Sequence, residues 1–134
     1  MVAHGNGSAT GGDGVPTKFS NKANSHASSL GLYLAEETYA FSGKSGGVHY
    51  TSVGLRLRGE SPGFNDAAHA RGVVAHGAPY VTATRAGRSE GCPAMERERA
   101  ARLLPLLADG GVVFVYSPND PRWLDADPWV RASN

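Results

Sequence analysis

The sequence predicts a mostly β, α+β fold in one domain with one main helix, and three observations lead to this prediction. Glycine supplies 18 of the 134 residues, well above the roughly 7% of ordinary chains, which indicates many turns and short strands. Short apolar or alternating segments follow one another between glycine clusters in the first part of the chain, as is typical of strands. The clearest helical spacing of apolar residues comes after Cys92.

The first part of the chain is predicted to form a loop and then strands. Residues 1–27 are rich in Gly, Ser, Asn and Thr, so we expect loop there, with at most one short strand at residues 2–4. A glycine cluster at residues 43–47 interrupts the apolar segments that follow. The strands are expected at residues 30–33, 38–41 and 51–57.

The middle of the chain places a histidine at the end of a strand. Residues 62–66 (PGFND) have the composition of a turn, and residues 67–72 fit one helical turn. Residues 73–75 (VVA) then predict a strand that leads into His76. His76 is therefore expected at a strand end, where functional sites are commonly built.

The main helix is expected to begin at Cys92 or Pro93, because proline suits the first helical position. Pro105 lies inside the pattern and predicts a kink or restart, and Gly110 is expected to end the helix. The residues at helical spacing are Met95, Arg99, Arg102, Leu103 and Leu106.

The last part of the chain predicts one strand and a tail. Residues 112–116 (VVFVY) predict a buried strand, and residues 1–116 form the predicted domain. Residues 117–134 contain three prolines and show no clear period, so we expect an irregular surface tail with Trp123 or Trp129 as anchors.

Composition excludes several classes of protein. The formal net charge is only +1 and neither sign forms a long run, so nothing predicts binding to nucleic acid or to a membrane surface. No apolar segment approaches the roughly 18 residues that span a bilayer, and residues 1–14 do not resemble an export signal. One cysteine excludes an internal disulfide.

Cys92 and His76 are the candidate catalytic residues. A cysteine attacks as its thiolate, whose pKa falls near a helix N-terminus or a protonated histidine, and both influences are expected at Cys92. Gly91 permits close approach of a substrate carbonyl, and the N–H groups of Gly91 and Cys92 are candidates for an oxyanion hole. Structural alternatives remain, since a lone cysteine is often a small core residue and a strand-end histidine is often structural.

Residues 73–94 (VVAHGAPYVTATRAGRSEGCPA) resemble the active-site segment of L,D-transpeptidases, in which a histidine is followed by a Ser/Thr-x-Gly-Cys motif. The variety with GRSxGCPA is the murein L,D-transpeptidase catalytic domain family, and the resemblance covers residues 2–116. It implies a compact YkuD-like β-sandwich or barrel with one main helix after the cysteine.

The resemblance also implies a reaction on peptidoglycan stem peptides. Cys92 would attack the carbonyl of the L-centre of a diamino acid in a tetrapeptide stem, expel the terminal D-Ala and form a thioester. An amine of a neighbouring stem would then take the acyl group to give a 3-3 cross-link, with His76 acting as base and then as acid. No metal or cofactor is implied, and the implied location is the periplasm or cell envelope.

Six further residues receive roles by the same resemblance. The carbonyl of Gly77 would orient His76, and the residues before the cysteine would shape the oxyanion hole. Arg88 would meet a stem carboxylate unless it is simply solvated, and Tyr80 would line the pocket unless it only packs. The residues before the cysteine are Ser89, Glu90 and Gly91.

The chain departs from the family pattern at two places. Glu90 stands where the broader family usually has histidine, so a more negative environment is expected to raise the pKa of the Cys92 thiol. Family members also carry strands and an export signal before the segment that corresponds to residues 2–7, so we expect a domain that lacks N-terminal strands.

Three other functions remain open from the residues. Water in place of the amine would make the protein a cysteine carboxypeptidase or hydrolase, and loss of catalysis would leave a peptidoglycan-binding module. A metal site built from His76, Cys92 and another histidine matches no familiar zinc spacing.

Overall fold

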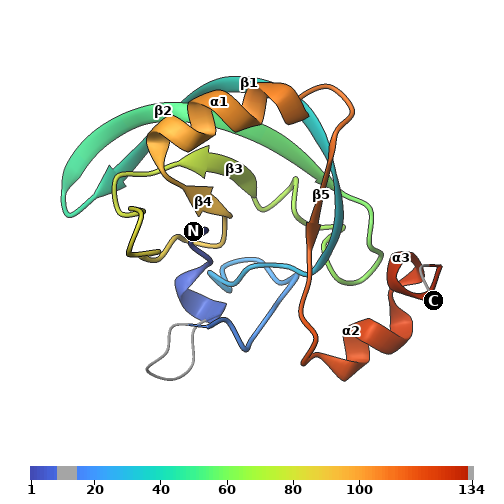
Figure 1. Ribbon diagram of the computed structural model, residues 1–134. Coiled ribbons are helices and arrows are strands. Elements are labelled where there is room, and N and C mark those ends of the chain that lie inside the picture. The colour runs from blue at the N-terminus through green and yellow to red at the C-terminus, as the bar shows by residue number, and fades with distance from the viewer. Residues whose placement is uncertain (9–14, 133–134) are drawn as a thin grey trace.

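A five-stranded mixed sheet with the strand order β4-β3-β2-β1-β5 organises the molecule. This computed structural model describes residues 1–8 and 15–132 (Figure 1). The strands are β1 (Gly31–Ser45), β2 (Val48–Gly59), β3 (Val74–Gly77), β4 (Ala94–Met95) and β5 (Val112–Val115). The helices are the 3-10 helix η1 (Asn6–Ser8), α1 (Arg97–Leu107), α2 (Pro121–Ala126) and α3 (Pro128–Arg131). The predicted fold class, mostly β with one main helix after the cysteine, is confirmed.

Strands β1 and β2 form a long antiparallel hairpin. The ladder closes at Ser45 and Val48, and the two turn residues Gly46 and Gly47 have φ angles of 56° and 80°. Both angles lie in the left-handed region that a two-residue type I′ turn requires, which explains the glycines. The strands predicted at residues 30–33 and 38–41 are in fact one strand, β1.

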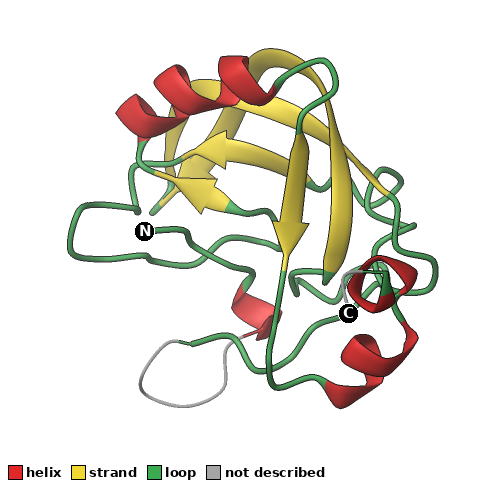
Figure 2. Cartoon of the chain, turned by 45° about the vertical axis from the view of Figure 1, so that its right-hand side comes forward, coloured by secondary structure: helices red, strands yellow, loops and turns green. Residues whose placement is uncertain are grey.

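A bulge explains why the alternation of β1 breaks without ending the strand. The register with β2 shifts between Ala35 and Thr38, where β1 has one residue more than its partner. Such an extra residue bends a strand and leaves its pairing intact on both sides. The sheet is correspondingly curved (Figure 2).

The main core lies between the sheet and α1. Leu55 and Leu57 of β2 are 0% and 1% exposed, whereas Arg56 between them is exposed, as the period of two in a strand requires. Ala100 and Leu104 of α1 pack against them. Figure 1 shows α1 lying across the strands near the β1–β2 hairpin.

The predicted start of the main helix at Cys92 or Pro93 is wrong. The carbonyl of Pro93 accepts the N–H of His76 at 3.2 Å, and Ala94–Met95 pairs in parallel with β3. Extended pairing with the sheet therefore prevails over local helix propensity until Arg97. The helix continues through Pro105 and ends at Leu107, before the predicted end at Gly110.

Strand β5 forms where it was predicted, but it is not buried. It pairs only with β1 at the end of the described sheet, and Val112 and Phe114 are 56% and 45% exposed. An end strand keeps one edge and part of its faces in solvent, which a run of apolar letters does not reveal. Residues 2–4 likewise form an isolated bridge between Ala3 and Ala94 instead of a strand.

The C-terminal tail contains the short helices α2 and α3, whereas the sequence predicted an irregular segment. Asp120 and Asp127 cap these helices by accepting the N–H groups of Trp123 and Trp129 at 3.0 and 2.9 Å. Trp123 is fully buried and packs against Phe114 at a ring distance of 5.6 Å. Residues 133–134 lie outside the described residues. None of the described helices has the length and apolar character to span a membrane.

Candidate active site

His76 is fixed by its own strand and by an aromatic ring. It belongs to β3, whose four residues are all buried, and its side chain is 3% exposed. Nδ1 lies 3.0 Å from the carbonyl oxygen of Gly77. When Nδ1 donates its proton to this carbonyl, Nε2 carries the lone pair that can accept a proton. The orienting role of Gly77 stays a prediction, and this contact supplies the geometry that such a role needs.

Phe41 is a neighbour of His76 that the sequence did not indicate. The two rings stack with their centroids 4.0 Å apart and their planes at 13°. Burial lowers the pKa of His76, and the hydrogen bond to Gly77 opposes this in part. The imidazole is therefore held mainly neutral at pH 7, which is the form that can take a proton from a thiol.

Cys92 lies in a pocket of about 370 Å³. The residue is half-buried, and its Sγ lies 3.9 Å from the carbonyl oxygen of Gly72. The pocket is lined by Ala23, Asn24, His26, Ala70, Arg71, Val73, Glu90 and Cys92. The thiol therefore faces a space that is large enough for part of a peptide.

The thiol is less acidic than the sequence suggested. Burial raises the pKa of Cys92, and the negative charge of Glu90 raises it further. A hydrogen bond from the backbone of Val74 and the positive charge of Arg71 act in the opposite direction. The expected lowering by a helix N-terminus is absent because α1 begins only at Arg97, whereas the predicted effect of Glu90 is confirmed in direction.

Cys92 and His76 come from segments that run next to each other, because Cys92 shortly precedes β4 and His76 lies on β3. His76 pairs with Ala94, two residues after Cys92, and the thiol hydrogen bond involves Val74, two residues before His76. Parallel neighbours lie roughly 4.8 Å apart, so the backbone that leads from Cys92 into β4 runs next to β3. Among the residues that the structure describes, no hydrogen bond joins the imidazole of His76 to Sγ of Cys92.

Ser89 organises the turn before the cysteine. Its Oγ donates to the carbonyl of Cys92 at 2.5 Å and accepts the N–H of Gly91 at 3.2 Å. Gly91 has a φ of 128°, which favours glycine. The N–H of Gly91 is thus used inside the turn, and the N–H of Cys92 is the better candidate for an oxyanion donor.

Glu90 is exposed and pairs with His26, a residue that the sequence analysis did not select. Nδ1 of His26 contacts one carboxylate oxygen, and Nδ2 of Asn6 donates to the other at 3.3 Å. His26 lies in loop-like sequence without periodicity, so the sequence alone does not single it out. The one feature of the sequence that points to His26 is that the pair Ser25-His26 belongs to the residues that resemble the family.

Arg71 is a second residue that sequence reasoning missed. Its guanidinium donates four hydrogen bonds, to the carbonyls of Ser20 and Ala27 and to the hydroxyls of Ser25 and Ser29, at 2.5 to 3.0 Å. It therefore fixes the loop of residues 20–29 against the Cys92 pocket. In the sequence, Arg71 is a single arginine before Gly72, and no motif around it predicts that it fixes a loop.

Only two of the predicted site residues, Cys92 and Glu90, line this pocket; the other six are His76, Gly77, Tyr80, Arg88, Ser89 and Gly91. Tyr80 is half-buried and packs on Gly87, where a Cβ would come within 2.6 Å of the Tyr80 carbonyl. Arg88 is exposed, and its charge joins burial in lowering the pKa of His4.

Among the described residues, no three His, Cys, Asp or Glu side chains gather as they would around a metal ion.

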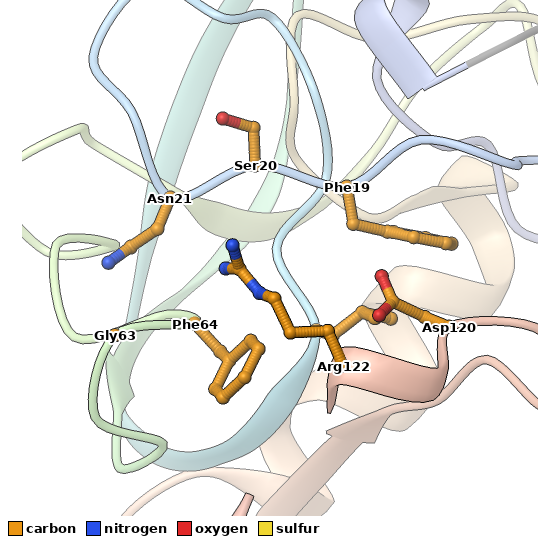
Figure 3. Close-up of a pocket in the computed structure, with 8 residues that line it drawn as sticks. Phe19, Ser20, Asn21, Gly63, Phe64, Asp120 and Arg122 are labelled. Carbon is orange, nitrogen blue, oxygen red and sulfur yellow. The ribbon is translucent and has the colours of Figure 1, made fainter. Parts of the chain in front are cut away.

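A second pocket, of about 240 Å³, lies between the tail and the N-terminal loop (Figure 3). The guanidinium of Arg122 lies 5.3 Å from the centre of the Phe64 ring in this pocket, and Asp120 and Phe19 form another part of its wall. It shares no lining residue with the Cys92 pocket, so it is separate from the candidate nucleophile.

Comparison with known proteins gives a family. Residues 1–116 match the family model described as the L,D-transpeptidase catalytic domain. No curated protein and no solved structure shows a significant match to the chain. The matched range includes Cys92, His76 and every other residue of the candidate site.

Proposed function

The chain belongs to the family of L,D-transpeptidase catalytic domains, and from this premise we propose that it is a cysteine peptidyltransferase acting on peptidoglycan stem peptides. Cys92 is the nucleophile, His76 is the base and the carbonyl of Gly77 orients the base. Action on this substrate places the protein at the cell envelope. The observation that supports the proposal is the hydrogen bond between Nδ1 of His76 and Gly77, on a strand that pairs with β4 two residues after Cys92.

The first half of the reaction forms a thioester. His76 takes the proton of the thiol, and Sγ of Cys92 attacks the carbonyl carbon of the stem. The C–N bond to the terminal D-Ala then breaks, its electron pair goes to nitrogen, and the nitrogen takes a proton from a protonated side chain of the pocket so that D-Ala leaves as an amine. The N–H of Cys92 is directed at the oxyanion, with Gly91 and Ser89 holding the turn in place.

The second half transfers the acyl group. The side-chain amine of a neighbouring stem attacks the thioester and gives one proton to the side chain that protonated D-Ala, and the C–S bond breaks, which gives the cross-link. The proton that His76 holds returns as the thiol is regenerated. Because the thiol pKa is raised, the neutral pair and not a preformed thiolate is the resting state, so His76 must act in every turnover.

The test is intact-mass spectrometry of the folded protein with a carbapenem, beside Cys92→Ala and His76→Ala. We expect one covalent adduct on the wild type, none on Cys92→Ala and a much slower adduct on His76→Ala. No adduct on the folded wild type would favour the peptidoglycan-binding module, which the raised thiol pKa and the exposed Glu90 also allow.

The acceptor is tested separately. A stem tetrapeptide is incubated with the protein, with and without an added diamino acid, and the products are separated by mass. Cross-linked product supports the transferase, whereas free tripeptide in the presence of excess amine supports the carboxypeptidase.

A further inference from the structure

Glu90, His26 and Asn6 form a polar network at the Cys92 pocket. The carboxylate of Glu90 accepts hydrogen bonds from Nδ1 of His26 and from Nδ2 of Asn6. The three residues come from separate segments of the chain, and His26 and Glu90 both line the pocket. With Nδ1 held by a carboxylate, Nε2 is the ring nitrogen that remains for proton exchange with a ligand.

The backbone holds His26 in a conformation that its residue type disfavours. Its φ of 53° lies in the left-handed region, where non-glycine residues are uncommon. The carbonyl of His26 accepts the N–H of Gly7 at 2.9 Å, and Arg71 holds the residues on either side, Ser25 and Ala27. Backbone strain that is fixed from several directions is concentrated at functional sites.

The pocket lining separates the two histidines. It contains Cys92 and His26 but not His76, which is buried against Phe41. A substrate in the pocket therefore meets the imidazole of His26 on its open side. Expulsion of an amine from a tetrahedral intermediate needs a proton donor at the nitrogen, and that nitrogen lies on the side of the carbonyl carbon away from Sγ.

We propose that His26, oriented by Glu90, is the second acid–base residue of this site, serving the amine while His76 serves the thiol. In acylation the C–N bond breaks, its electron pair goes to nitrogen, and protonated His26 gives that nitrogen the proton on Nε2. In transfer the attacking amine returns a proton to Nε2 as the new C–N bond forms. The inference rests on the proposed function of Cys92.

The test compares two leaving groups on the same stem peptide. One substrate carries the natural D-Ala amide, and the other carries a 4-nitrophenyl ester, whose phenolate leaves without a proton. His26→Asn is the main variant, because asparagine tolerates a positive φ, and Glu90→Gln is the second. His69→Asn, at an exposed histidine outside the pocket, is the control.

We expect His26→Asn to lower the rate of D-Ala release at least tenfold while ester acylation of Cys92 stays within twofold. Glu90→Gln should lower the ratio of the amide rate to the ester rate by a smaller factor, since a change in thiol reactivity affects both rates. Retained ester acylation also shows that the variant is folded. An equal loss on both substrates, or no loss on the amide, would overturn the role of His26 alone. A wild type that neither substrate acylates would instead refute the proposed function of Cys92 itself.

Discussion

The acidity of the Cys92 thiol is set by burial and by three neighbouring groups, and these effects oppose one another. Burial and Glu90 raise its pKa, and the backbone of Val74 and the charge of Arg71 lower it. A raised pKa means a smaller thiolate fraction at pH 7 than a free cysteine has. Activation must therefore come from a base at the moment of reaction, and the unassisted reactivity of the thiol is low.

Glu90→Gln is expected to make the free thiol more reactive. Removing the negative charge lowers the thiol pKa, so alkylation by iodoacetamide at pH 7.5 should speed up. The gain should be less than about tenfold, since Glu90 is exposed and water screens its charge. Rates follow from intact mass against time, with Glu98→Gln on α1 as the control. A slower or unchanged rate would contradict the electrostatic argument.

Phe41→Leu is expected to loosen His76. The stacked ring pair is worth about 0.5–1.5 kcal/mol beyond its buried area, and an imidazole that is free to tilt loses the orientation that Phe41 and Gly77 give it. We expect carbapenem acylation of Cys92 to slow by up to about tenfold. Phe41→Tyr keeps the ring and should react like the wild type. Equal rates for the leucine and tyrosine variants would remove Phe41 from the site.

At the residue scale, the sequence revealed what is local and missed what is assembled from a distance. The contact of His76 with Gly77, which the family resemblance implied, and the charge effect of Glu90 on Cys92 both involve near neighbours in the chain. Phe41 comes from β1 and His26 from the N-terminal loop, so their contacts exist only after the sheet and the loop have folded.

At the scale of elements, pairing with the sheet prevents the residues just after the cysteine from forming the helix that their sequence predicts. Pro93 and the helical spacing after it are real, yet β3 offers Ala94–Met95 a parallel partner and delays α1 to Arg97. The glycine cluster at residues 43–47 was a reliable signal because two left-handed φ angles in succession nearly require glycine. The bulge in β1 had no such signature.

Leu104→Ala is expected to cost about 2–5 kcal/mol of unfolding free energy, because Leu104 is completely buried between α1 and the sheet. Leu106→Ala provides a matched control on the same helix, where the side chain is 81% exposed; its cost should stay within about 0.5 kcal/mol. Urea unfolding of both variants measures the difference. Similar midpoints would mean that α1 does not pack as described.

At the scale of the whole molecule, the tail is part of the folded unit although it lies beyond the family match. Trp123 is fully buried against Phe114 and Tyr116 at the end of β5, and its Nε1 donates to Asp127 at 2.6 Å. Trp129 donates from Nε1 to the carbonyl of Glu60 at 2.7 Å. The tail thus covers an end strand that would otherwise expose aromatic surface.

Trp123→Ala is expected to lower stability by about 3–5 kcal/mol, because it leaves a large cavity and removes a hydrogen bond from the buried Asp127. Trp129→Ala should cost less, since that side chain is 45% exposed. The melting temperatures of the two variants and the wild type provide the comparison. A Trp123 variant as stable as the Trp129 variant would show that the tail is a loose appendage.

The parallel pairing of β3 with β4 has a consequence for how the protein would fail on heating. In the described chain this ladder consists of the pairs His76 with Ala94 and Gly77 with Met95, whereas the β1–β2 ladder is several times longer. Short ladders open by local fluctuation at a lower free energy than global unfolding. Warming should therefore separate Cys92 from His76 and abolish acylation several degrees before the circular dichroism of the sheet changes, so heat inactivation would be reversible as long as the hairpin stays intact.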